Sequence, residues 1–176
     1  MFRVTRCFVL ALLCGSVAAS GASAASLSRS PMPTAARLLA MHNLERSRVN
    51  APPLVWDWRL AAAAASYGPT LARMGRLQHS PRQLRPGQRE NLWMGSRGAF
   101  SPEQMVGSWI EERNAFRPGV FPAVSRTGDW SDVAHYTQLI WKDTTHVGCA
   151  IQPAGQWDYL ICRYSPPGNI DGRRLP

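Results

Sequence analysis

Lysine is almost missing from this 176-residue chain, in which 19 of the 20 basic residues are arginine. Only 11 residues are acidic, so the formal net charge is +9. A basic surface can attract anionic partners, including lipid head groups. The arginines are scattered, with only Arg82, Arg85 and Arg89 clustered, and no nucleic-acid-binding motif is visible. Because the arginines are scattered and no such motif is present, we predict no nucleic-acid partner and at most an auxiliary contact with a membrane surface.

Long hydrophobic runs are also missing, since no segment approaches the roughly 18 apolar residues of a membrane-spanning helix. The apolar run Cys7 to Val17 is short, follows Arg3 and Arg6, and precedes the small residues Ala22-Ser23-Ala24. This order is typical of a secretory signal peptide, which we assign to residues 1–25. The sequence thus predicts an exported protein, extracellular or periplasmic. The mature chain would carry a net charge of about +7, with 18 basic and 11 acidic residues.

Cysteine is scarce. Two of the four cysteines, Cys7 and Cys14, lie in the predicted signal peptide, which leaves Cys149 and Cys162. Each of these sits within an apolar, strand-like run, in a compartment that favours oxidation. A disulfide between neighbouring strands is therefore predicted in preference to a catalytic thiol.

Several motifs of enzymes and metal sites are absent. The chain has no His-Glu-x-x-His, no paired Cys-x-x-Cys, no histidine pair at i and i+4, and no Gly-x-Ser-x-Gly. Ser80 follows His79 directly, which is too close in sequence to indicate a nucleophile with its base. By motif alone, neither a zinc-binding helix nor a hydrolase elbow is indicated.

The residues that are present predict an α+β domain. Residues 26–33 read as a flexible lead-in, residues 34–172 as one domain and residues 173–176 as a tail. Three longer helices are expected. The first covers 34–49 and is capped by Thr34; the second covers 58–75, is capped by Asp57 and bends or breaks at Gly68-Pro69. The third covers 102–116 and follows the cap Ser101. A short helix should carry His135, strands should run near 90–94, 147–151 and 157–162, and 166–176 should be loop.

Two carboxylates stand out by periodicity. In the third helix, Met105, Trp109, Glu112 and Phe116 share one side, so Glu112 faces apolar neighbours while Glu111 faces solvent. A buried carboxylate needs a partner. Arg113 would also fit that role as an ion-pair mate.

Glu90 lies on the same strand face as Leu92 and Met94. His135 shares a helix side with Leu139, and His79 precedes the stiff Ser80-Pro81. We expect these two histidines and two glutamates to meet in one polar pocket. Four separately satisfied polar residues remain the alternative, with His42 as a structural residue and His146 as an exposed turn residue.

The chain resembles the CAP superfamily of cysteine-rich secretory proteins, antigen 5 and pathogenesis-related proteins. The resemblance rests on stretches that occur in the family's order: His42-Asn43 with Arg46, Pro53-Leu54 to Asp57, His79-Ser80, Glu90-Asn91-Leu92, Trp109 with Glu112, His135-Tyr136-Thr137-Gln138, Gly148-Cys149, and Cys162-Arg163-Tyr164 to Asn169. Ala134 and Arg89 depart from the pattern, and Arg89 could brace or partly neutralise Glu90. Extra cysteines of the plant members are absent.

The resemblance implies an α-β-α sandwich with a small central antiparallel sheet flanked by helices, and a large cleft. It maps the family's cleft tetrad onto His79, Glu90, Glu112 and His135. It also implies a divalent cation, often Zn²⁺, held mainly by His79 and His135. Two neutral imidazoles with water and nearby carboxylates suit Zn²⁺, and binding should weaken when the imidazoles gain protons at acidic pH.

Three functions are compatible with this sequence. The first is a non-enzymatic, monomeric secreted module. It would bind a lipid or sterol, or a membrane surface, through Phe116, Phe121 and Trp130 in a turn-rich stretch, or, as the resemblance implies, interact with a host or act in defence. The second is a metal-dependent hydrolase in which Glu90 or Glu112 acts as general base. The third is a structural domain whose tetrad only holds the cleft together. The residues favour the first function and leave enzymatic activity undecided.

Overall fold

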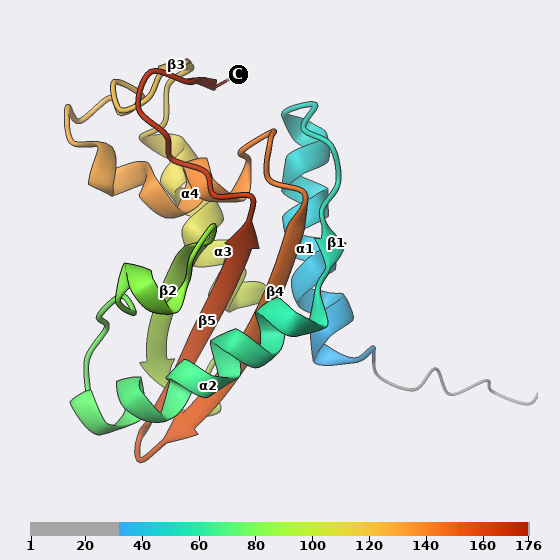
Figure 1. Cartoon of the computed structure of the whole chain (residues 1–176), viewed down its shortest axis with the longest axis vertical. Helices are drawn as coiled ribbons and strands as arrows, with labels where there is room; N and C mark the ends of the chain where they lie inside the picture. Colours follow the sequence, from blue (N-terminus) through green and yellow to red (C-terminus); the bar gives the residue numbers. More distant parts are fainter. Residues whose placement is uncertain (1–31, 176) are drawn as a thin grey trace, which may run out of the picture. The chain divides into compact units, whose positions relative to one another are not determined.

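The computed structural model describes residues 32–175, and these residues fold around a four-stranded sheet (Figure 1). The strands are β1 (Val55–Trp56), β2 (Arg89–Ser96), β4 (His146–Ala154) and β5 (Trp157–Ser165), in the order β1-β4-β5-β2. The β4, β5 and β2 pairings are antiparallel, and β1 joins β4 in parallel. The predicted α+β class is therefore confirmed, with one short parallel edge strand added.

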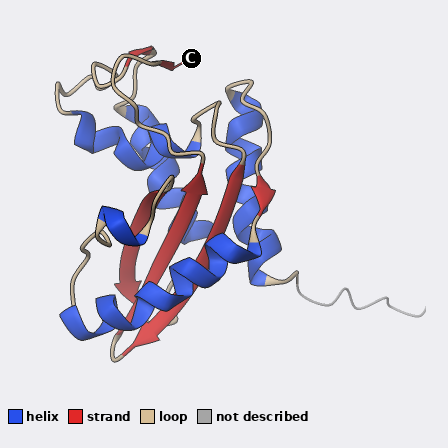
Figure 2. Cartoon of the chain, viewed as in Figure 1, coloured by secondary structure: helices blue, strands red, loops and turns tan. Residues whose placement is uncertain are grey.

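Helices cover both faces of this sheet, as the two views show (Figures 1 and 2). Helix α2 (Trp58–Met74) lies across β4 and β5 on one face. Helices α1 (Thr34–Arg48), α3 (Pro102–Glu111) and α4 (Ala134–Leu139) pack together on the other. Each face has its own buried apolar cluster, which gives the expected α-β-α sandwich.

Helix α2 begins as the sequence predicts and continues where a break seemed possible. The Asp57 carboxylate accepts hydrogen bonds from the backbone N–H groups of Arg59 and Leu60, which caps the helix. Pro69 lies inside the helix, which runs unbroken to Met74. A residue before proline normally avoids the helical region because its Cβ meets the proline ring. Gly68 has no Cβ, so this clash is absent and the helix continues through Pro69, although proline cannot donate the backbone hydrogen bond of that turn.

Helices α1 and α3 differ from prediction at one end each. Thr34 is the first helical residue rather than the cap, a position that Pro33 takes without a side-chain bond. Ser101 caps α3 in a reciprocal capping box with Gln104, as predicted. The α-helix stops at Glu111, however, and a 3-10 turn, η2 (Glu112–Asn114), replaces the last predicted turn. This tighter turn lets Phe116 return to the core and form a bridge with Ser125.

The β4–β5 hairpin is the centre of the sheet. Cys149 and Cys162 face each other across it and form the predicted disulfide. Gly148 lies beneath the N-terminus of α2, where an added Cβ would overlap the backbone of Asp57 and Ala61. The glycine therefore allows helix and sheet to approach closely. His146 is exposed as expected, although it begins β4 rather than occupying a turn.

The last described residues do not trail as a loop. Strand β6 (Arg174–Leu175) pairs antiparallel with β3 (Gly119–Val120), and Leu175 is buried in the core. The expectation of loop over residues 166–176 was therefore wrong for Arg174 and Leu175. A side chain buried by a distant segment leaves no periodic signal in so short a stretch.

A buried arginine joins α1 to the end of α4. The Arg46 guanidinium is fully buried and donates hydrogen bonds to the carbonyl oxygens of Pro52, Leu139, Trp141 and Thr144. Burial lowers the pKa of Arg46 to about 10, which still leaves the group charged at neutral pH. Four carbonyl acceptors satisfy a charge that would otherwise be costly to bury.

The predicted signal peptide (1–25) and most of the lead-in lie outside the described residues. Within residues 32–175, none of the helices combines the length and apolar character needed to cross a bilayer.

Candidate functional site

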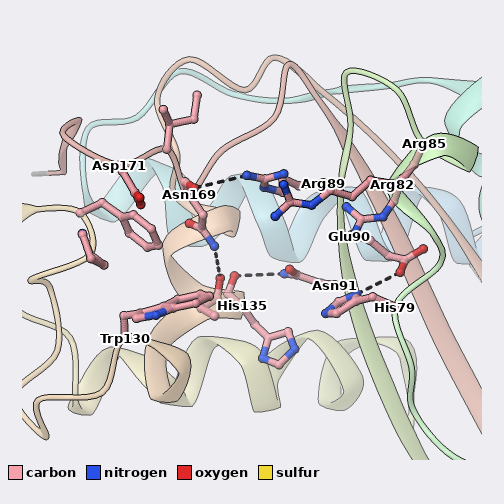
Figure 3. A pocket seen from close by; sticks show the side chains of 14 residues that line it. His79, Arg82, Arg85, Arg89, Glu90, Asn91, Trp130, His135, Asn169 and Asp171 are labelled. Carbon is pink, nitrogen blue, oxygen red and sulfur yellow. Dashed lines mark hydrogen bonds and ion pairs between the residues drawn. The ribbon is translucent and has the colours of Figure 1, made fainter.

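A cleft of about 620 Å³ opens beside the sheet, near α4 and the start of β2 (Figure 3). It draws its lining from the loop before β2, the stretch before α4 and the segment after β5. The lining residues are His79, Arg82, Arg85, Arg89, Glu90, Asn91, Phe121, Pro122, Trp130, Ala134, His135, Asn169, Ile170 and Asp171. Both predicted histidines and Glu90 therefore line one cavity.

His79 is oriented by Glu90. The imidazole Nδ1 lies 2.9 Å from Glu90 Oε1, and the glutamate side chain is fully buried at the start of β2. Burial alone would raise the pKa of this carboxyl, but hydrogen bonds from His79 and Ser80 and the charge of Arg163 outweigh it, so the pKa is lowered. An ionised Glu90 accepts the Nδ1 hydrogen. The lone pair of His79 is then on Nε2.

Arg163 and Ser80 hold the Glu90 carboxylate on its other sides. Ser80 donates to it twice, from its backbone N–H to Oε1 and from its hydroxyl to Oε2. Arg163 Nε lies 2.9 Å from Oε2 but does not point along that line, so the contact is an ion pair without a hydrogen bond. One Arg163 Nη instead donates to the Ser80 hydroxyl at 3.0 Å. Glu90 thus has its counter-charge on the neighbouring strand, paired in register with it.

His135 is oriented by Glu112 in the same way. Glu112 Oε1 lies 2.6 Å from the imidazole Nδ1, and Oε2 accepts from the backbone N–H groups of His135 and Tyr136 at 3.0 Å each. The carboxylate therefore fixes both the first turn of α4 and the imidazole it carries. Glu112 stands behind His135 and does not line the cavity. Arg113 does not pair with Glu112 but reaches Glu45.

The His135 ring also stacks on Trp109 of α3, with ring planes 13° apart and centroids separated by 5.8 Å. A chain of hydrogen bonds supports its backbone. Asn91 donates to the His135 carbonyl oxygen at 3.0 Å and to the Tyr164 hydroxyl at 3.2 Å. The Tyr164 oxygen lies 2.8 Å from Nε2 of the buried His42. His42 is thus the structural residue that the sequence predicts.

The two imidazoles share one arrangement, which the sequence does not reveal. In each, Nδ1 is bound to a carboxylate, and Nε2 makes no hydrogen bond within residues 32–175. Carboxylate partners of this kind orient the histidine ligands of metal ions. In the described part of the chain, no group of three or more His, Cys, Asp or Glu side chains is arranged to hold a metal. The protein thus offers two imidazole nitrogens.

The aromatic residues predicted for lipid contact separate into two groups. Phe121 and Trp130 line the cleft, with ring centroids 5.4 Å apart. Phe116 is buried in the core against Tyr136 and does not line the cleft. Sequence reasoning assigned Phe116 to a surface that it does not reach, because the turn-rich stretch has no periodicity from which side-chain direction could be inferred.

Arginine contacts were the main element missed. The sequence suggested that Arg89 could brace or partly neutralise Glu90. Among the described residues the Arg89 side chain forms no ion pair with Glu90, and its Nε donates to the Gly168 carbonyl oxygen at 3.1 Å instead. Arg163 neutralises Glu90 instead. The alternating pattern of β5 places Arg163 on one face, but its partner follows only from the β2–β5 register.

Comparison with known proteins gives a consistent family. The model of the cysteine-rich secretory protein family (CAP) matches residues 39–164. A pathogenesis-related protein of PR-1 type from Sambucus nigra is 36% identical over 135 residues, which cover 76% of each chain. Secreted protein RBT4 from Candida albicans is 33% identical over 141 residues, covering 78% of this chain and 36% of that protein.

Solved structures agree with the fold. The crystal structure of NaASP2 with Zn²⁺ is similar with a TM-score of 0.67 and 25% identity, and the match covers 81% of this chain and 85% of that one. BmVAL-1 is similar with the same TM-score at 23% identity, covering 84% and 82% of the two chains.

Proposed function

The chain belongs to the cysteine-rich secretory protein (CAP) family, and on this premise we propose that it is a secreted binding module whose cleft holds a divalent cation between His79 and His135. The family relationship and the similarity to a secreted protein of Candida albicans support export. The proposal for the cation rests on the histidines themselves.

One observation carries the cation proposal: each imidazole has its Nδ1 bound to a glutamate, its Nε2 has no partner among residues 32–175, and both imidazoles line the same cavity. Neutral imidazole nitrogens are preferred ligands of Zn²⁺. Two of them form an incomplete set, so water or a bound molecule would supply the remaining ligands. The Zn²⁺ in the NaASP2 structure is compatible with such a role here.

The surroundings favour binding over catalysis. A general base must have a lone pair directed at the water that it deprotonates. Glu90 is buried and held by His79, Ser80 and Arg163, and Glu112 stands behind His135 with both oxygens engaged. The Ser80 hydroxyl is buried and donates to Glu90, so it is not placed as a nucleophile. A cation would supply Lewis acidity, but among residues 32–175 neither Glu90 nor Glu112 is placed as a free base beside it.

A second candidate function is favoured by the aromatic side of the cleft. Trp130 is 45% exposed and packs edge to face on Phe121, which is only 3% exposed, so the indole supplies most of the apolar wall of the cavity. Such a wall suits the hydrocarbon part of a fatty acid or sterol. We therefore propose that the module accepts an amphiphile along this wall, whether or not the cation is bound.

The cation proposal is tested by titrating metal-free protein with Zn²⁺ in a calorimeter. We expect His79→Ala and His135→Ala each to weaken binding at least tenfold, and the double variant to abolish it. His146→Ala, which removes an exposed histidine outside the cleft, is the matched control and should bind like the wild type. Equal affinity in the wild type and the double variant would exclude this site.

The amphiphile proposal is tested with a fluorescent sterol and a fluorescent fatty acid. Trp130→Ala should weaken binding several-fold, while Trp58→Ala, which removes a 72% exposed indole from outside the cleft, should leave it unchanged. Identical curves for the two variants would remove the aromatic wall from consideration. Cleavage of casein that is abolished by chelator would instead support the hydrolase alternative.

A further inference from the structure

Three arginines line the cleft next to His79, and the cation proposal gives them no role. Arg82, Arg85 and Arg89 come from the loop before β2 and from its first residue. Figure 3 shows their side chains on the same side of the cavity as His79 and Glu90. Like charges repel, so such a grouping is costly unless something offsets it.

Two of these arginines are positioned by backbone carbonyls. Arg85 Nε donates to the Ser80 carbonyl oxygen at 3.0 Å, and Arg89 Nε donates to the Gly168 carbonyl oxygen at 3.1 Å. Each guanidinium therefore keeps N–H donors for another partner. Arg82 makes no hydrogen bond or ion pair through its side chain among the residues that the structure describes.

Counter-charge is short around this group. Within residues 32–175, none of the three arginines forms an ion pair with a carboxylate. Glu90 is taken by Arg163 and His79. Asp171 is the other acidic residue that lines the cleft. Burial, followed by the charges of Arg82 and Arg85, lowers the pKa of Arg89, and Asp171 opposes this only in part.

From this arrangement we propose that Arg82, Arg85 and Arg89 form a binding site for a phosphate-type oxyanion at the edge of the cleft. Guanidinium forks match the geometry of phosphate oxygens and form short, charge-assisted hydrogen bonds with them. The anion supplies the charge that the cleft lacks. This site uses no atom of the proposed cation site and does not depend on the cation.

The aromatic residues on the same cleft extend the chemistry of the ligand. Phe121 and Trp130 provide apolar surface in the same cavity as the three arginines. A molecule with a phosphate group and a hydrocarbon part would contact both. Free phosphate and a phospholipid head group share the anion, so the experiment must separate them.

The test uses the protein with chelator present, so that failure of cation binding cannot affect the result. Inorganic phosphate is titrated by calorimetry at low salt. Sedimentation with phosphatidylcholine vesicles, with and without phosphatidic acid, provides the second arm. We expect phosphate binding and a preference for the vesicles that contain phosphatidic acid. Phosphate binding without vesicle binding would identify a soluble phosphate compound as the ligand.

The variant Arg82→Gln/Arg85→Gln/Arg89→Gln should reduce both signals at least tenfold. Its matched control is Arg59→Gln/Arg73→Gln/Arg97→Gln, which removes the same charge from exposed arginines outside the cleft. Because Arg85 and Arg89 support backbone carbonyls, Arg82→Gln alone serves as the variant least able to disturb folding. It should weaken phosphate binding several-fold with an unchanged melting temperature.

Two results would overturn the proposal. One is the absence of saturable phosphate binding together with equal sedimentation in both kinds of vesicle. The other is an equal loss in the cleft variant and the control variant, which would show that only the overall positive charge attracts anions.

Discussion

Glu112 forms two hydrogen bonds with His135: Oε1 lies 2.6 Å from the imidazole Nδ1, and Oε2 accepts from the backbone N–H of the same residue at 3.0 Å. One side chain in η2, directly after α3, therefore sets the position of α4 and the direction of its imidazole. Trp109 of α3 also supports the imidazole by stacking on it. The orientation of the free Nε2 thus depends on residues outside the cavity.

Glu112→Gln should weaken Zn²⁺ binding by about 10- to 100-fold, the usual range for loss of such a partner. If the amide oxygen stays on the two backbone N–H groups, the amide nitrogen faces Nδ1 and favours the tautomer with hydrogen on Nε2. In that tautomer Nε2 carries the hydrogen, so it has no lone pair with which to bind the cation. Nitrogen NMR shifts of the imidazole report the change directly.

Glu111→Gln is the matched control, because Glu111 is the preceding residue and is exposed. It should retain both the tautomer and the affinity of the wild type. An unchanged tautomer and affinity in Glu112→Gln would show that Glu112 only supports the helix.

Arg82→Gln should raise the affinity for Zn²⁺ at low salt by about two- to fivefold. The guanidinium lines the same cavity as the two histidines and repels a cation there. At 1 M salt the Debye length is about 3 Å, so the gain should disappear. Calorimetric titrations at two salt concentrations check this, with Arg59→Gln as the control. A gain that persists at high salt would argue against repulsion as its cause.

Folding stability should decrease as the pH falls from about 6.5 towards 4. Burial lowers the pKa of His42 from 6.5 to about 4, so the unfolded chain binds a proton in this range that the folded protein does not. The free energy of unfolding therefore rises with pH across this window. The contribution of His42, about 3 kcal/mol in total, is present above pH 6.5 and is lost as the pH falls to about 4. Urea unfolding between pH 4.5 and 7 measures this slope.

His42→Gln should flatten that pH dependence, even if the variant is less stable at every pH. His146→Gln, at an exposed position, should keep the slope of the wild type. Equal slopes in His42→Gln and the wild type would assign the pH dependence to other groups.

Gly148→Ala should lower the free energy of unfolding by roughly 1–3 kcal/mol, as overpacking does in a tight core. The added Cβ would overlap backbone atoms of Asp57 and Ala61, which cannot move without shifting α2 from the sheet. Gly107→Ala is the control, since the site is helical and its added Cβ would meet nothing within 4 Å beyond the adjoining residues and backbone of its own helix. That variant should gain about 0.5–1 kcal/mol from helix propensity. Both values follow from denaturant unfolding, and a neutral Gly148→Ala would contradict the close contact.

The features that sequence predicts well here are those with local causes. The Asp57 cap, the Ser101 capping box and the Cys149–Cys162 hairpin each depend on residues a few positions apart or on one alternating pattern. Glu90 could be assigned to an inner face for the same reason. Glu90 is buried as predicted, but Asn91 on the opposite face of β2 is buried too, so alternation alone does not distinguish an exposed side of this strand.

The contacts that complete the site have no such local cause. Arg163 meets Glu90 because of the register between β2 and β5, and a shift by one residue would turn it to the other face. Arg46 finds its four carbonyl acceptors only when the end of α4 folds back towards α1. The short β3–β6 pair likewise joins segments more than fifty residues apart.

The C-terminal segment that ends in β6 supports a residue of the cleft. Phe121, which lines the cavity, donates its backbone N–H to the Arg173 carbonyl oxygen and accepts from the Gly172 N–H. Trimming by a carboxypeptidase that removed Leu175 would take away a core side chain and weaken the two backbone hydrogen bonds that hold Phe121. Expression vectors for ligand studies should therefore leave this segment unaltered and attach affinity tags elsewhere.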